Sequence, residues 1–399
     1  MAKVKQDPIV IVSSMRTPIG SFQGVLQSMT APQLGASAVK AAVQQARIAP
    51  EEISEVLMGC VLPAGQGQAP ARQAALGAGL TESTPCTTVN KVCGSGMKTV
   101  MLAYDALHIR TKDVIVAGGF ESMTNAPHLL PKMRAGQRLG HAAVKDHMFL
   151  DGLEDAYNNK GRLMGAFAED TAQHYQFTRE AQDAFAIESL TRARKANEDG
   201  SFAKEMTPLT LKNRKGETKV DRDEQPFAAD ISKISNLRPA FREEGTVTAA
   251  NSSSISDGAA AVVMMRLSEA ERRGITPLAK VISTSSNAQA PQWFTTAPIG
   301  AIRKVLDAAG WSIGDVGLFE INEAFAVVSM AAMRDLDIPH DIVNIHGGAC
   351  ALGHPLGASG TRIIVTLLNA MEKHSQDRGI ASLCIGGGEA TAIAIERMH

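Results

Sequence analysis

The chain has 399 residues, 44% of them apolar and 20% charged, and a formal net charge of −1. This balance excludes a disordered chain and argues against a general nucleic-acid binder, which needs a basic face. Five cysteines with no C-x-x-C pair argue against a disulfide framework and a cysteine zinc site. We find no signal or transit peptide and no apolar run near the roughly 18 residues of a membrane helix, so we expect a cytoplasmic protein without membrane contact.

One pattern of elements occurs twice along the chain. Residues 30–57 and 296–319 both open with Thr-Ala-Pro, continue as an Ala-rich amphipathic helix and end in an apolar strand. Residues 93–107 and 357–371 each place Ser-Gly at the start of an apolar helix. We infer that two copies of one α/β unit form the body of the protein.

The helices of the second pair share a further feature, because each carries a basic residue two positions after the Ser-Gly: Lys98 and Arg362. After each helix, residues 114–122 and 382–390 predict a buried strand that ends in a Gly-Gly turn followed by Glu. The alternation of apolar strands with helical patterns predicts covered sheets of the α/β class.

The first copy is interrupted before its last strand. In the second copy, strand 390–397 follows at once, whereas the equivalent in the first copy is residues 257–266, more than 130 positions later. The intervening segment contains an amphipathic helix at 178–200, with a Thr N-cap and a terminal Gly, and a charged hairpin at 210–224. Its basic residues in 204–242 fit either ligand phosphates or a solvated face.

Two cysteines occupy turns where ligands bind in α/β proteins. Cys93 lies in a Gly-rich turn before a helix that we predict from about residue 96 to 108, and free amides there should lower the thiol pKa below about 8.5. A buried structural cysteine is the alternative. Cys384 lies at the strand-to-turn junction of the other copy, which favours a catalytic pair.

Two further polar positions have two interpretations each. His354 lies in a Gly-His-Pro loop and is either a general base for a thiol or a hydrogen-bonded structural histidine, and the structural interpretation is favoured for His346. Asn322 either donates to an oxyanion or caps a helix, and the cap is favoured when the residue is taken alone. No phosphate-loop or His-Glu-x-x-His motif is present, so we predict no metal.

Five motifs, in this order, resemble the thiolase family, and most closely its bacterial acetyl-CoA acetyltransferases: NKVCGSGMK, GGFESM, NEAFA, GGACALGHPLGASG and CIGGG. The resemblance extends over about residues 8–397. It implies an α/β thiolase fold, a duplicated five-layer α-β-α-β-α body with an inserted loop domain, assembled as a homotetramer. The implied domains are an N-terminal half at 1–122 completed by 251–272, a coenzyme A-binding insert at 123–250, and a C-terminal half at 273–399.

The resemblance also assigns roles to individual residues. It makes Cys93 the acyl-accepting nucleophile, which His354 deprotonates. Cys384 becomes the acid and base at the carbon alpha to the thioester. Asn322 positions a water in a first oxyanion hole, together with His354, and the backbone amides of Cys93 and Gly386 form a second.

The implied reaction is the reversible condensation of two acetyl-CoA molecules to acetoacetyl-CoA, by a ping-pong mechanism through an acyl-cysteine. Acyl-CoA and CoA are then substrates, with no separate cofactor. The alternative is a broader 3-ketoacyl-CoA thiolase of fatty-acid degradation. A ketoacyl synthase is disfavoured by Cys384, and a non-catalytic acyl-CoA binder by the presence of all four catalytic side chains. The implied coenzyme A contacts are Ser253, Met164, Phe241, Ala324 and Phe325.

Three residues depart from the family's acetyl-specific pattern. Leu163 stands where His is common, Phe294 where Met is expected, and Phe227 where an Arg often contacts phosphates. We expect the acyl-chain preference to depend on these positions, and Leu163 predicts tolerance of longer or branched acyl groups.

Overall fold

A computed structural model describes residues 7–213 and 216–399. Among the described residues, ten strands form one hydrogen-bonded sheet in the order β12-β13-β14-β11-β1-β10-β5-β3-β4, with β2 (Gly20–Ser21) paired to β10. Because β1 and β11 share only two residue pairs, we treat the strands on either side of this seam as a first and a second sheet. The first sheet contains β1 (Ile9–Arg16), β3 (Glu55–Gly59), β4 (Cys86–Val89), β5 (Val114–Ser122) and β10 (Ser256–Arg266). The second contains β11 (Ala279–Ala288), β12 (Leu318–Ile321), β13 (Arg378–Ile385) and β14 (Glu389–Arg397). The seam joins Val10 to Lys280 and Ile11 to Ala279.

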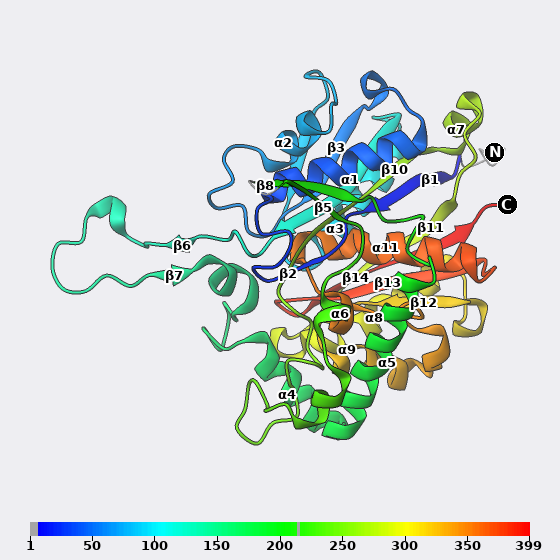
Figure 1. Ribbon diagram of the computed structural model, residues 1–399. Helices are drawn as coiled ribbons and strands as arrows, with labels where there is room; N and C mark the ends of the chain where they lie inside the picture. Colours follow the sequence, from blue (N-terminus) through cyan, green and yellow to red (C-terminus); the bar gives the residue numbers. More distant parts are fainter. Residues whose placement is uncertain (1–6, 214–215) are drawn as a thin grey trace.

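Layers of helices alternate with the two sheets, which gives five layers that are stacked from top to bottom in Figure 1. The outer face of the first sheet carries α1 (Ala31–Ala46) and α2 (Pro70–Gly77), and the outer face of the second carries α8 (Ala297–Ala309) and α9 (Ala326–Leu336). Between the sheets lie α3 (Ser95–His108) and α11 (Leu356–Lys373). The predicted five-layer thiolase body is confirmed.

The last two strands of each copy pair in the same way. β10 runs antiparallel to β5, with Asp257 opposite Ser122, and β14 runs antiparallel to β13, with Glu389 opposite Ile385. The strand that follows the insert therefore completes the first copy, as predicted from the repeat.

Close packing at the centre depends on glycine. Helices α3 and α11 contact each other, and the Thr361 hydroxyl donates to the Gly96 carbonyl at 2.8 Å. A Cβ at Gly119 of β5 would lie 1.9 Å from the Gly357 carbonyl oxygen, so only a residue without a side chain fits there. Three apolar clusters fill the spaces between successive layers.

The insert folds around one side of this body. It contains β6 (His128–Leu129), β7 (Lys145–Asp146), α4 (Met164–Tyr175), α5 (Arg179–Glu198), β8 (Leu209–Asn213), β9 (Gly216–Val220) and α6 (Gln225–Ala228). The strands β6 and β7 form the base of an arm that projects from the molecule (Figure 1). Thr178 caps α5 by accepting from the Ala181 amide at 3.2 Å, and the hairpin β8–β9 forms, both as predicted. Its turn at 214–215 lies outside the described residues.

Shorter helical elements connect these parts: α7 (Leu267–Arg273), α10 (Ala349–Leu352), a π-turn at Phe149–Leu153, and 3-10 turns at Pro50–Glu52, Met133–Ala135, Ile231–Asn236, Pro291–Thr296, Ile313–Asp315 and His340–Ile342. The domain boundaries at 122, 250 and 272 stay predictions. Of the helices in the described ranges, none is both long and apolar enough to cross a lipid bilayer.

A buried ion cluster ties the insert to the first sheet. Arg16 of β1 is fully buried, and its guanidinium contacts Glu205 at 2.5 Å and Asp223 at 2.7 Å. Both carboxylates belong to the insert, and the Asp223 carboxylate also accepts from the Ile19 amide at 2.9 Å. The cluster therefore holds the insert against the body by charge-assisted hydrogen bonds.

Candidate active site

The Cys93 turn is held by the side chains on either side of it. Val92 has a left-handed backbone with φ +47°, which is strained for a β-branched residue. The Asn90 side chain accepts from the Val92 amide at 2.9 Å. The Ser95 hydroxyl accepts from the Lys91 amide at 2.8 Å and donates to the Val92 carbonyl at 2.7 Å. The turn thus presents Cys93, which is partly exposed, just ahead of α3.

The predicted lowering of the Cys93 pKa is wrong. Burial of the sulfur raises the pKa of Cys93 to about 11, and this outweighs hydrogen bonds from the backbone amides of Gly386 and of Cys93 itself, which lower it. The sulfur nevertheless lies where these two amides converge. They are the amides that the resemblance assigns to the second oxyanion hole.

Cys384 lies close to Cys93, at the end of β13. Burial raises the pKa of Cys384 well above its usual value, and the neighbouring Cys93 raises it further. The two turns also pack together, because a Cβ at Gly94 would lie 2.3 Å from Ile385 Cδ1. An ion pair between Lys91 and Glu389 joins the same two turns.

His354 is buried as a neutral base. Its amide donates to the Ser254 carbonyl at 3.1 Å, and its Nδ1 lies 2.5 Å from the Ser359 hydroxyl. We assign the proton of that hydroxyl to the Pro355 carbonyl, which lies 2.9 Å away, so that the hydroxyl accepts from Nδ1–H. Nε2 is then unprotonated, and it is buried without a partner. Burial, and after it the charge of Arg362, lowers the pKa of His354 to about 3.

Asn322 follows β12 and is 1% exposed. Its amide donates to the Ser382 carbonyl at 3.0 Å, and its Oδ1 lies 3.5 Å from Arg362 Nη2, while its Nδ2 has no partner. The helix-cap interpretation is wrong, because α9 begins only at Ala326, with Phe325 at the N-cap position. The side chain is therefore free to donate to a bound group.

The five predicted coenzyme A contacts come together. The Ser253 amide donates to the Ala324 carbonyl at 3.0 Å, and the rings of Phe241 and Phe325 meet edge to face at 6.0 Å. Met164, Phe241, Ala324 and Phe325 share one cluster with Cys384.

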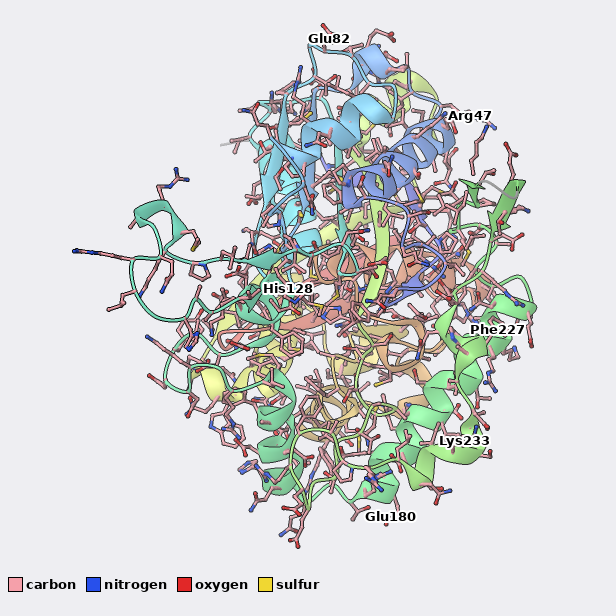
Figure 2. All side chains as sticks on the ribbon, turned by 60° about the vertical axis from the view of Figure 1, so that its left-hand side comes forward. Arg47, Glu82, His128, Glu180, Phe227 and Lys233 are labelled. Carbon is pink, nitrogen blue, oxygen red and sulfur yellow. The ribbon has the colours of Figure 1, made fainter. Side chains whose placement is uncertain are left out.

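Of the three departures from the family pattern, Phe294 belongs to this cluster. Phe294 is 3% exposed within the cluster, and Leu163 directly precedes α4. The guanidinium of Arg222 lies over the ring of Phe227, which belongs to the insert and is labelled in Figure 2.

Other residues singled out from the sequence have structural surroundings. Cys60 and Cys350 are buried beside carboxylates, Glu121 and Glu323 respectively, and burial raises both thiol pKa values. Among the described residues, no group of three or more His, Cys, Asp or Glu side chains is placed to hold a metal ion. The sequence reasoning missed Ser359 and did not use Arg362, although Arg362 matches Lys98 in the repeat.

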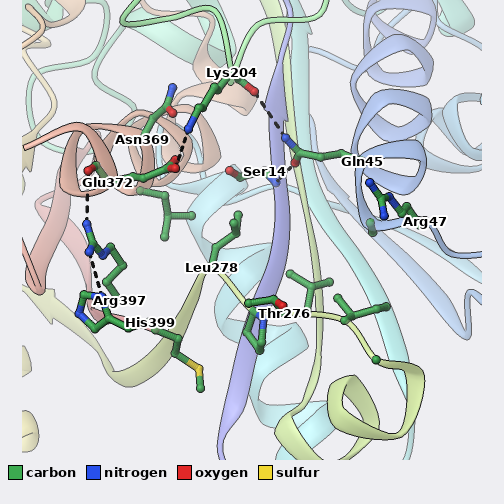
Figure 3. Close-up of a pocket in the computed structure, with 17 residues that line it drawn as sticks. Ser14, Gln45, Arg47, Lys204, Thr276, Leu278, Asn369, Glu372, Arg397 and His399 are labelled. Atoms are coloured by element: carbon green, nitrogen blue, oxygen red, sulfur yellow. Dashed lines mark hydrogen bonds and ion pairs between the residues drawn. The ribbon is translucent and has the colours of Figure 1, made fainter. Parts of the chain in front are cut away.

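Two surface cavities are lined by none of the predicted site residues. One of about 300 Å³ lies in the insert beside residues 249–250, with Lys233 and Leu237 in its wall. The other, of about 850 Å³, lies at the far end of α11, where Lys204 and Glu372 form an ion pair (Figure 3).

The chain belongs to the thiolase family: the model of the thiolase N-terminal domain matches residues 9–268 and that of the C-terminal domain matches 275–397. An acetyl-CoA acetyltransferase of Allochromatium vinosum is 47% identical, over 98% of this chain and 99% of that protein. A cytosolic acetyl-CoA acetyltransferase of Mus musculus is 47% identical, over 98% of both. The structure of the Acat5 thiolase from Ascaris suum in complex with coenzyme A superposes with a TM-score of 0.92, at 39% identity, over 98% of this chain and 100% of that one.

Proposed function

We propose that the protein is an acetyl-CoA C-acetyltransferase that interconverts two acetyl-CoA molecules with acetoacetyl-CoA and CoA. The observation that carries the proposal is the unprotonated, unpartnered Nε2 of buried His354, in a site that also holds two thiols. The names of the full-length relatives support acetyl groups over longer acyl chains.

In the first half-reaction, Cys93 Sγ attacks the thioester carbonyl carbon of acetyl-CoA and gives its proton to His354 Nε2. Because the pKa of Cys93 is about 11 and that of His354 about 3, a free thiolate is unfavourable, so we expect proton transfer to accompany the attack. The C–S bond to coenzyme A then breaks, and the departing sulfur takes the proton from His354. Cys93 is left as an acetyl thioester.

In the second half-reaction, the Cys384 thiol gives its proton to His354 Nε2, and the resulting thiolate removes a proton from the alpha carbon of a second acetyl-CoA. Burial makes the Cys384 thiolate a strong base, which suits a weakly acidic carbon. The enolate oxygen accepts from the now protonated Nε2 of His354 and, through a water, from Asn322. The alpha carbon then attacks the acetyl carbonyl on Cys93, whose oxygen faces the amides of Cys93 and Gly386. The Cys93–acetyl C–S bond breaks, and the Cys93 sulfur takes the proton from His354.

The substrate is proposed to lie across the insert, with its thioester between the two cysteines. The shared cluster of Met164, Phe241, Ala324 and Phe325 supports this placement, and so does the coenzyme A complex of the Ascaris suum relative. The reaction uses coenzyme A thioesters as substrates and no separate cofactor. A location in the cytoplasm, to be checked by cell fractionation, is supported by the cytosolic mouse relative.

A substrate panel in the thiolysis direction tests the proposed reaction. Phe294 packs against Phe167 and Phe325 at ring distances of 6.4 and 6.5 Å, beside Cys384, and so limits the space for the acyl chain. We expect kcat/KM for acetoacetyl-CoA to exceed that for 3-ketohexanoyl-CoA by about 10–200-fold. Phe294→Ala should narrow this ratio.

Equal turnover of both substrates would instead support the broader thiolase of fatty-acid degradation and the tolerance predicted from Leu163. No thiolysis of either substrate would refute the proposed function.

A homotetramer is proposed from the family resemblance. The projecting arm supports it by exposing large apolar side chains: Leu130, Met133, Leu139 and Val144. Light scattering should give four times the 42.2 kDa chain mass, and Leu139→Asp should lower the assembled fraction. A native protein that stays monomeric at micromolar concentration would refute this assembly.

A further inference from the structure

The guanidinium of Arg362 is buried in the middle of the protein with few partners. Arg362 lies in α11 and is 2% exposed. Its Nη1 forms an ion pair with Glu320 Oε2 at 3.6 Å and its Nη2 is 3.5 Å from Asn322 Oδ1, whereas neither Nε nor Nη1 has a hydrogen-bond partner. Burying a cation this deeply is costly, so a use for the charge is expected. We propose that Arg362 is a positioning residue that turns the side-chain amino group of Asn322 toward the water that binds the substrate's thioester oxygen.

The chemistry of the two groups determines which way Asn322 faces. A guanidinium has only donors, so the Asn322 oxygen must face Arg362 and its NH₂ group must point away. The backbone of Asn322 is fixed by the hydrogen bond to the Ser382 carbonyl. Its Nδ2 is left buried and without a partner, which is unfavourable unless a ligand or water accepts from it.

The neighbouring carboxylates leave Arg362 available for this contact. Glu323, next to Asn322 in the chain, accepts from the Ser189 hydroxyl at 2.7 Å, the Asn344 side chain at 2.8 Å and the Cys350 amide at 3.1 Å. The Glu323 carboxylate makes these three hydrogen bonds without the guanidinium of Arg362. Glu320 contacts Nη1, and Nη2 therefore remains for Asn322.

Comparison of the two copies gives independent support. At the matching place in the first copy, α3 carries Lys98, which is partly exposed, and the residue that follows β3 is Cys60. In the second copy the basic residue is fully buried, and the residue that follows β12 is Asn322. The buried cation therefore occurs in the copy that also has a carboxamide to orient.

The test is a double-mutant cycle between Arg362→Met and Asn322→Ala, in enzyme that is verified as folded by circular dichroism. We expect Arg362→Met to lower kcat for condensation about 10–100-fold, with KM within threefold, because an oxyanion donor is misplaced. Acetylation of Cys93 by acetyl-CoA should continue. The double variant should have the kcat of Asn322→Ala alone, since both changes remove the same interaction.

Losses that multiply in the double variant, or a folded Arg362→Met enzyme with native kcat, would overturn the proposal. If Arg362→Met does not fold, Arg362→Lys retains the charge opposite Glu320 but not the planar fork. It should lose at least fivefold in kcat, and native kcat would again overturn the proposal. The inference rests on the proposed function, and the native enzyme separates the two: absence of activity there refutes the function, whereas loss of coupling refutes only the role of Arg362.

Discussion

The Cys384→Ala variant is expected to accept an acetyl group on Cys93 but to lose about 10²–10⁴-fold in the rate of condensation, the usual contribution of a positioned acid or base. Acylation needs only Cys93, His354 and the amides of Cys93 and Gly386, and none of these depends on the second thiol. Carbon–carbon bond formation needs the base at the alpha carbon, which only Cys384 is proposed to supply. Mass spectrometry of the acetyl adduct measures the first step, and steady-state condensation measures the second.

Alkylation by iodoacetamide provides the control. Acetyl-CoA should protect Cys93 from alkylation in both the native and the Cys384→Ala enzyme, because the sulfur is then a thioester. Cys350→Ala removes another buried thiol and should leave both steps unchanged, because Cys350 bonds to Glu323 and packs against Phe185 and Ala326, none of which is assigned a step in the reaction. Condensation at the native rate in Cys384→Ala would show that the acid and base role is assigned wrongly. If acetyl-CoA failed to protect Cys93, the result would contradict the proposed acetyl thioester on Cys93.

The duplicated fold was predictable because its signals are local and repeated. The Ser-Gly helix starts and the Gly-Gly strand ends recur in both copies, so the strand at 256–266 could be assigned to the first copy across the insert. The seam between the sheets was not predictable. It consists of two residue pairs, Val10 with Lys280 and Ile11 with Ala279. The sequence of an edge strand does not indicate which other strand it will pair with.

The site was predictable in its residues but not in its electrostatics. A helix N-terminus favours a thiolate by only about 0.3–1 kcal/mol, and desolvation of the Cys93 sulfur outweighs it. The cap interpretation of Asn322 failed for a tertiary reason, because the Ala326 amide at the start of α9 is satisfied by the Asn251 carbonyl at 2.8 Å. Ser359 and Arg362 were hidden within an apolar helix pattern, which does not reveal that one orients His354 and the other faces Asn322.

The largest stability effect is expected at Arg16. Arg16→Met should lower the free energy of unfolding by about 3–5 kcal/mol, because it leaves the carboxylates of Glu205 and Asp223 buried without their cation. The matched control is Lys204→Met, which removes an exposed ion pair with Glu372 and should cost at most about 1 kcal/mol. Urea unfolding followed by circular dichroism compares the two variants.

The same cluster predicts how the damage can be repaired. If the loss comes from uncompensated carboxylates, then Glu205→Gln and Asp223→Asn added to Arg16→Met should recover stability, because the neutral amides of similar shape no longer need a cation. Glu205 also accepts from Asn369 at 2.9 Å and Thr366 at 3.2 Å on α11, so part of its hydrogen bonding survives without Arg16. A triple variant as unstable as Arg16→Met would mean that packing of the arginine against Phe202, rather than its charge, holds the insert in place.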